Sequence, residues 1–182
     1  MLFGLSFRKM NRFCRFWVFV IAAFAFTACR PHDKYPVEPA IEFISLEKIS
    51  EQGNDKDVRL AFSFKDGDGD IGLDDDDLYP PFDTSSLFYY NCFISYFEKQ
   101  NGEFVEVELP LPLNMRIPRL SKEASESIEG EIYLDLYAVN PFSRFDTIRY
   151  ELFIVDRALN FSNVITTSEF VVDKKKLKQE NP

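Results

Sequence analysis

Apolar and polar residues alternate along much of this chain, and a period of two is typical of β-strands with one buried face. From Val58 to Lys65, every second residue is a large apolar one. The runs that begin at Ile128 and Ile148 follow the same pattern, whereas the remaining segments are less regular. The pattern predicts seven strands, at residues 40–48, 57–65, 86–98, 103–109, 128–137, 148–155 and 163–172.

The connections between these strands are mostly polar, and one of them has a specific turn signal. Asn101-Gly102 separates the runs 86–98 and 103–109, and Asn-Gly strongly favours a tight hairpin turn. No helical period of useful length follows the first 28 residues, apart from a turn near Ser121–Ser127. Seven strands in about 135 residues predict an antiparallel β-sandwich that spans residues 40–173.

A motif of alternate residues lies near the end of the predicted sandwich: Tyr150-x-Leu152-x-Ile154-x-Asp156-x-Ala158-x-Asn160-x-Ser162. It resembles the F strand and F–G turn of bacterial immunoglobulin-like and fibronectin-type-III-like domains, with Leu159 where glycine is usual. The resemblance implies a seven-stranded antiparallel immunoglobulin-like β-sandwich. Two interpretations of Tyr150 follow, a tyrosine corner that closes the preceding connection or an ordinary core tyrosine.

The first 28 residues have the composition of a secretory signal peptide. Residues 1–15 contain four Arg and Lys side chains and no acidic one, and an apolar run from Phe16 to Phe26 follows. A basic segment, an apolar core of about 7–15 residues and a small residue before the cut define such signals. The run is shorter than the roughly 20 residues needed to cross a bilayer. We expect cleavage after Ala28. The alternative is that the apolar run is a buried helix preceded by a charged segment.

The segment Phe26-Thr27-Ala28-Cys29 resembles the lipobox of bacterial lipoproteins, with Phe26 in place of the usual leucine. The resemblance implies that Cys29 carries a diacylglycerol and usually a third acyl chain, palmitate for example, which together anchor the protein to a membrane. In that family, Arg30 rather than aspartate after the cysteine favours the outer membrane. Residues 29–39 contain three prolines and are predicted to form a tether, and residues 174–182 a basic tail.

The charge of the chain excludes some classes of function. The net charge is −9, and removal of residues 1–28 leaves 17 basic and 30 acidic side chains, which is −13. Nucleic acid is therefore not an expected partner, because phosphates require basic patches. With Cys29 acylated, Cys92 is left without a cysteine partner and is predicted to be a core residue. Since the single histidine, His32, lies in the tether, no Cys–His nucleophile is expected and we predict a non-enzymatic protein.

Aspartates and glycines alternate directly after the strand predicted at 57–65, in the sequence KDGDGDIGLDDDD of residues 65–77. Glycines allow a tight loop to direct several carboxylates to one point, and Ca²⁺ prefers six to eight oxygen ligands. Counted from Asp66, the spacing resembles the twelve-residue loop of EF-hand calcium sites, in which Gly72 would contribute its carbonyl. The predicted calcium ligands are Asp66, Asp68, Asp70, Gly72, Asp74 and Asp77.

Departures from the EF-hand pattern limit this resemblance to calcium-binding DxDxD loops in general. Ile71 stands where glycine is usual, Asp77 stands where glutamate is usual, and the loop follows a strand rather than a helix. The alternative is a solvated, mobile acidic loop, because carboxylates without a cation repel one another.

Strand order adds a geometric expectation. If 57–65 is the second strand, the acidic loop lies at the same end of the sandwich as the turn with Asp156 and Asn160, which become candidate additional ligands. The first strand runs antiparallel to the second, so the tether also reaches the domain at this end. A cation there would stiffen the domain relative to its tether or bridge to anionic headgroups.

Residues 74–86 make the connection after this strand unusually long, and loops beyond about 12–15 residues tend to be functional or disordered. We expect a non-enzymatic cell-envelope lipoprotein, a binding or structural module whose partners are the membrane and an unidentified envelope protein or glycan. The alternatives are a glycan-binding accessory lipoprotein of an uptake system, and a hydrolase with two facing carboxylates. The aromatic residues in or near the loop either form a glycan platform or pack the loop onto the sandwich: Tyr79, Phe82, Phe88, Tyr89 and Tyr90.

Overall fold

The computed structural model describes residues 35–49, 57–121 and 126–173. Contacts divide the chain into two compact units, Met1–Lys34 and Tyr35–Pro182. The predicted signal peptide, Cys29, His32 and the predicted tail lie outside the described residues. Because the second unit contains both sheets and the whole described core, it can be studied without the first. Among the described residues, no helix is long and apolar enough to cross a membrane.

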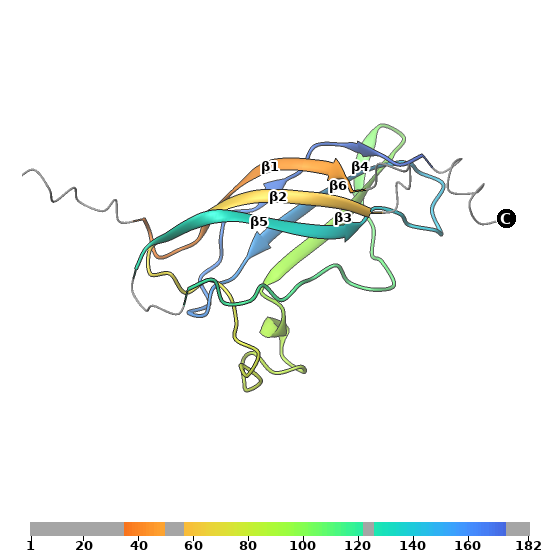
Figure 1. Cartoon of the computed structure of the whole chain (residues 1–182). Helices are drawn as coiled ribbons and strands as arrows, with labels where there is room; N and C mark the ends of the chain where they lie inside the picture. The colour runs from red at the N-terminus through yellow and green to blue at the C-terminus, as the bar shows by residue number, and fades with distance from the viewer. Residues whose placement is uncertain (1–34, 50–56, 122–125, 174–182) are drawn as a thin grey trace, which may run out of the picture. The chain divides into compact units, whose positions relative to one another are not determined.

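The first sheet has three antiparallel strands in the order β1-β2-β5 (Figure 1). Its members are β1 (Ala40–Lys48), β2 (Asp57–Asp66) and β5 (Ile128–Tyr137). Strand β2 is central, and its pairing with β5 runs without interruption from Asp57 opposite Tyr137 to Asp66 opposite Ile128. The end of β2 and the starts of β1 and β5 therefore meet at one end of the sheet.

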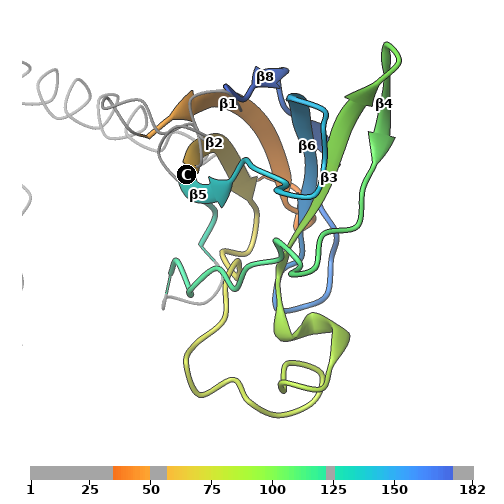
Figure 2. The same ribbon diagram turned by 90° about the vertical axis from the view of Figure 1, so that its right-hand side faces the viewer.

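The second sheet follows the order β4-β3-β6-β7, and β8 pairs with another part of β6 (Figure 2). All pairings in it are antiparallel. Its strands are β3 (Cys92–Gln100), β4 (Glu103–Glu106), β6 (Thr147–Ile154), β7 (Ile165–Thr166) and β8 (Phe170–Val171).

The two sheets enclose a single hydrophobic core. Alternate residues of β2 and β6 point into it, so that Leu60, Phe62, Tyr150 and Leu152 are buried. Buried residues of both sheets belong to one contiguous cluster. The alternation in the sequence therefore identifies the inner face of each sheet, and the all-β, two-sheet arrangement confirms a β-sandwich architecture. Cys92 is fully buried in this core, as predicted.

Several predicted strands have other bounds. Strands β1 and β5 match the prediction, but the strand predicted at 86–98 begins only at Cys92, because η1 (Leu87–Tyr89) forms a 3-10 turn. Strand β4 ends at Glu106 rather than at residue 109, because the chain leaves β3 after the bond from the Val107 amide to the Tyr96 carbonyl. The run 163–172 is divided into β7 and β8, which gives eight strands among the described residues. There the Thr167 hydroxyl accepts the hydrogen bond of the Tyr150 amide, in place of a backbone carbonyl.

Tyr150 connects the two sheets. Its ring is buried edge-to-face against Tyr96, and its hydroxyl donates to the carbonyl of Tyr137 at 3.1 Å. Tyr137 is the last residue of β5, so this bond fixes the connection between β5 and β6. The bonded carbonyl lies 13 residues upstream of Tyr150, and the assignment of a tyrosine corner stays a prediction. The predicted hairpin is also present, with positive φ angles of 54° at Asn101 and 96° at Gly102.

Candidate metal centre

Four aspartates from two loops meet at one end of the sandwich. Asp66 ends β2, Asp68 and Asp70 follow in the next loop, and Asp156 lies two residues after β6. One carboxylate oxygen from each of the four lies within 4.8 Å of the others. We call these four residues the aspartate cluster. The strand-order argument is thereby confirmed, because Asp156 joins the acidic loop from the far end of the sequence.

The loop after β2 is tight because its own side chains bond to its backbone. The amide of Asp70 donates to Oδ2 of Asp66 at 2.9 Å, which closes a turn around the intervening residues. Gly67 is required by close packing: a Cβ there would lie 2.2 Å from the Tyr35 carbonyl oxygen and 2.6 Å from that of Pro36. The last part of the predicted tether therefore packs directly on this loop.

The turn after β6 holds the fourth aspartate in place. Both carboxylate oxygens of Asp156 accept hydrogen bonds from Asn160, from its backbone amide at 2.8 Å and from its side-chain amide at 2.9 Å. Leu159, where related turns usually have glycine, adopts a left-handed conformation with φ 67°. Asn160 was predicted as a candidate ligand. The structure places its side-chain NH₂ group on Asp156, where it orients that carboxylate, and ligation by its oxygen stays a prediction.

The cluster contains carboxylate oxygens that are buried but unpaired. Oδ1 of Asp66, Asp68 and Asp70 is inaccessible to solvent and has no hydrogen-bond partner in the part of the chain that the structure describes. The side chain of Asp66 as a whole is fully buried. An ionised carboxylate taken out of water without compensation is strongly unfavourable, and a coordinated cation is one of the few groups that compensates several at once.

The pKa values of the clustered aspartates also indicate that positive charge is lacking at this site. Burial, followed by the nearby charge of Asp68, raises the pKa of Asp66 to about 6. Burial and the charge of Asp156 raise the pKa of Asp70 to about 6 as well. Burial also raises the pKa of Asp156. Without a cation, the ionised forms of Asp66, Asp70 and Asp156 are therefore less favourable than those of exposed aspartates.

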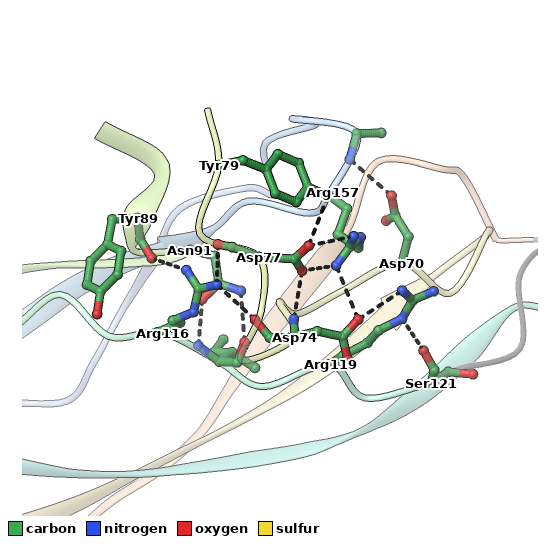
Figure 3. A network of polar contacts seen from close by, with 12 residues as sticks. Asp70, Asp74, Asp77, Tyr79, Tyr89, Asn91, Arg116, Arg119, Ser121 and Arg157 are labelled. Atoms are coloured by element: carbon green, nitrogen blue, oxygen red, sulfur yellow. Dashed lines mark hydrogen bonds and ion pairs between the residues drawn. The ribbon is translucent and has the colours of Figure 1, made fainter. Parts of the chain in front are cut away.

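Asp74 and Asp77 do not belong to the cluster. Asp77 is buried and forms a two-contact ion pair with Arg157, in which Nη2 lies 3.0 Å from Oδ1 and Nη1 contacts Oδ2 (Figure 3). Oδ2 of Asp74 lies 3.3 Å from Nη1 of Arg119 and 3.5 Å from Nη1 of Arg157. Both carboxylates are thus engaged by arginines outside the cluster, and their role as metal ligands stays a prediction that these contacts do not favour.

The pKa of Asp77 reflects this pairing. Burial alone would raise the pKa, but hydrogen bonds from Arg157, from the amide of Asp74 and from the Tyr79 hydroxyl outweigh it and lower the pKa. Asp77 is therefore a stable anion, unlike the aspartates of the cluster. The spacing of aspartates along the chain does not distinguish the two kinds of environment.

Arg116 completes the arginine network, which we define as Arg116, Arg119 and Arg157 with Asp74 and Asp77. Its guanidinium donates to the carbonyls of Tyr89, Asp74 and Asp77 at 2.8–3.0 Å and stacks 5.2 Å from the ring centre of Tyr89 (Figure 3). The network holds both ends of the long loop between β2 and β3. Sequence patterns alone did not identify these arginines. The sequence did contain one hint of this network, because Arg157 lies between the predicted ligands Asp156 and Asn160 and would bring a positive charge to the acidic loop.

Gly72, the predicted carbonyl ligand, has a role in the backbone of the loop. It adopts φ 99°, and a Cβ there would lie 2.2 Å from the Pro118 carbonyl oxygen. Its neighbours Ile71 and Leu73 exchange backbone hydrogen bonds with the segment from Ile117 to Leu120. These pairings account for the glycine, and ligation by its carbonyl stays a prediction.

The aromatic residues of the long loop are largely packed. Phe82 is buried, while Phe88, Tyr89 and Tyr90 are half-buried and contact other rings or Arg116. Tyr79 is about half exposed, and its hydroxyl bonds to Asp77.

Comparison of the chain with models of protein families, with curated proteins and with solved structures gave no match in any of the three. The chemistry of the site therefore rests on its geometry. Four carboxylates, three of them with a buried unpaired oxygen, can hold a metal ion.

Proposed function

We propose that this chain is a non-enzymatic, lipid-anchored protein of the bacterial cell envelope with a calcium-stabilised immunoglobulin-like domain. The observation that carries the proposal is the set of three buried, unpaired carboxylate oxygens in the aspartate cluster. A bound cation would satisfy all three at once. It would also join the loop after β2 to the turn after β6.

The ligand set favours calcium over other common ions. All four groups are carboxylates, which suits hard cations, whereas Zn²⁺ sites usually contain nitrogen or sulfur ligands. The four oxygens all lie within 4.8 Å of one another, so one Ca²⁺ with bonds of 2.3–2.6 Å can reach all of them. Mg²⁺ usually binds only one or two protein carboxylates and keeps several waters. Water or backbone carbonyls would supply the remaining ligands.

The position of the cluster suggests what the ion does. Gly67, inside the acidic loop, packs against the carbonyls of Tyr35 and Pro36, where the folded domain begins. Asp70 accepts a hydrogen bond from the amide of Ala158, in the turn after β6. Calcium at the cluster would therefore stabilise the end of the domain that is attached to the tether. The membrane anchor would be Cys29, and Arg30 favours the outer membrane.

The immunoglobulin-like assignment is supported by topology. The sheet orders β1-β2-β5 and β4-β3-β6-β7 are those of a fibronectin-type-III-like sandwich whose last strand is divided in two. The hydrogen bond from Tyr150 to Tyr137 supplies the tyrosine corner.

Thermal unfolding of residues 30–182 tests calcium binding. Calcium at 100 times its Kd stabilises by about 2.7 kcal/mol, which in a domain of this size raises Tm by about 5–10 °C relative to the chelated protein. Asp66→Asn should abolish the increase, and the exposed Asp76→Asn should preserve it. A Tm that is the same with calcium and with chelator would overturn the proposal. Retention of Cys29→Ser in the membrane fraction would overturn the lipid anchor.

A further inference from the structure

The two outer faces of the sandwich differ in chemistry. On the three-stranded sheet the outward side chains are mostly charged or polar, and Arg59 pairs there with Asp135. The outward face of the five-stranded sheet carries phenylalanines instead. Phe93 and Phe97 project from β3, Phe104 from β4 and Phe153 from β6, and all four are half-buried. An apolar outer face of this kind on a soluble domain commonly marks an interaction site.

Two of these rings, Phe93 and Phe153, form a closed group with Phe88 and Phe161 at the end of the sheet near the aspartate cluster. Phe93 and Phe153 are stacked, with centroids 5.0 Å apart and planes at 13°. Phe88 meets Phe93 and Phe161 edge-on, and Phe161 lies 5.8 Å from Phe153. The rings of Phe93 and Phe153 therefore cover one face of each other, and Phe88 and Phe161 contact the same pair.

A groove of about 890 Å³ runs beside this pair. It exists because the chain after β4 leaves the sheet. The Val107 amide donates to the Tyr96 carbonyl, and the Met115 amide donates to the Cys92 carbonyl. Between these two bonds β3 advances by four residues, whereas the neighbouring segment advances by eight. The extra residues, which include Pro110 and Pro112, bulge outward and form one wall. The β3 residues 93–96 also line the groove, which gives it a length of about 13 Å, enough for an extended segment of four residues.

The charge around the groove is negative. Glu106 and Glu108 are exposed on its wall, and neither forms an ion pair with any residue that the structure describes. Glu151, also in the lining, is paired with Arg149 at 2.9 Å. A second copy of this chain would bring like charges together, and an anionic membrane would be repelled. Exposed carboxylates beside apolar rings favour a ligand with basic and apolar groups, which a protein segment supplies and a neutral sugar does not.

We propose that this groove binds an extended segment of a partner protein, with apolar side chains flanked by lysine or arginine. The inference deepens the proposed role as an envelope binding module by naming the chemical class of its partner, and it rests on that role. Apolar side chains would contact Phe93 and Phe153, while basic ones would pair with Glu106 and Glu108. None of the four clustered aspartates lines the groove, so calcium binding and peptide binding can fail separately.

Fluorescence anisotropy with labelled nine-residue peptides tests this proposal on residues 30–182 in the presence of calcium. Three peptides share leucine and proline at the same positions and carry Lys, Ser or Glu at the others. We expect the Lys peptide to bind at least tenfold more tightly than the Ser peptide, and the Glu peptide not to bind. The double variant Glu106→Gln/Glu108→Gln should lose at least tenfold in affinity for the Lys peptide.

The control is Glu103→Gln, which removes an exposed carboxylate of β4 outside the groove and should retain full affinity. All of these glutamates are exposed, so their substitution is not expected to impair folding. Equal binding of the three peptides, no binding, or an affinity unaffected by the double variant would overturn the proposal. Binding of neutral oligosaccharides in place of the peptide, or a dimer in sedimentation that the double variant abolishes, would also overturn it. Loss of calcium binding with retained peptide binding would contradict only the metal centre.

Discussion

The carboxylate of Asp70 accepts a hydrogen bond of 3.0 Å from the amide of Ala158, 88 positions away in the sequence. This contact ties the loop after β2, in the three-stranded sheet, to the turn after β6, in the five-stranded sheet. It leaves Oδ1 of Asp70 buried and unpaired beside the other aspartates. The hydrogen bond therefore joins the two loops of the cluster but leaves one Asp70 oxygen that a cation could bind.

The metal-free domain should lose stability as pH rises from 4 to 7. In the folded state the pKa of Asp66 and of Asp70 is about 6, above the ordinary value of 3.8. Between these values the folded state binds more protons than the unfolded state, so the free energy of unfolding falls with increasing pH. We expect a loss on the order of 2 kcal/mol, measured by urea unfolding in the presence of chelator.

The trend should reverse below pH 4 and disappear with calcium. The pKa values of Asp77, Asp83 and Asp135 are lowered in the folded state, so their contribution to stability is lost as pH falls through that range. Saturating calcium keeps the clustered carboxylates ionised and paired, which should remove the loss between pH 4 and 7. Stability of the chelated protein that rises steadily from pH 4 to 7 would contradict this account.

Asp77→Ala should destabilise the domain without impairing calcium binding. The substitution leaves Arg157 without its main partner in a partly buried position, and breaking such a pair costs about 3 kcal/mol. The free energy of unfolding from urea titrations measures the effect, and the exposed Asp76→Ala should change it by less than about 0.5 kcal/mol. If Asp77→Ala folds but no longer binds calcium, Asp77 is a ligand and its assignment to the arginine network is wrong.

Tyr150→Phe should weaken the connection between β5 and β6. It removes the hydroxyl that donates to Tyr137 but keeps the buried ring, so we expect a loss of about 1–2 kcal/mol in the free energy of unfolding. Tyr133→Phe is the matched control, because the Tyr133 hydroxyl bonds only to an exposed carboxylate. Equal stability of the two variants would mean that the Tyr150 hydrogen bond contributes nothing.

Much of the fold could be predicted because each sheet has one buried face. Strands β2 and β5 follow the alternation of the sequence closely, whereas the register of β1 shifts between Phe43 and Ser45. The errors occurred where side chains replace the backbone in pairing. Thr167 interrupts the last strand through its hydroxyl, and Asn91 pairs through its side chain with both backbone groups of Ile117. The alternation of apolar and polar residues does not show where a side chain takes the place of a backbone group in a hydrogen bond.

The candidate site was predicted in part for a related reason. The DxDxD spacing identified Asp66, Asp68 and Asp70, since a tight loop alone brings these three together. Asp156 emerged from strand order, because both loops leave the same end of the sandwich. The sequence pattern did not show that arginines engage Asp74 and Asp77, because these partners are 45 and 80 positions away in the sequence. The spacing of residues within a loop indicates its shape, but it does not show which charged residues from elsewhere in the sequence pack against it.

Isothermal titration of chelator-treated residues 30–182 with calcium tests the central claim most directly. We predict one ion per chain, with binding abolished in Asp66→Asn and in Asp156→Asn, which come from opposite sheets. Binding should persist in Asp74→Asn, because Arg119 and Arg157 already engage that carboxylate. A protein that takes up no calcium, or whose uptake depends on Asp74 and not on Asp156, would contradict the account.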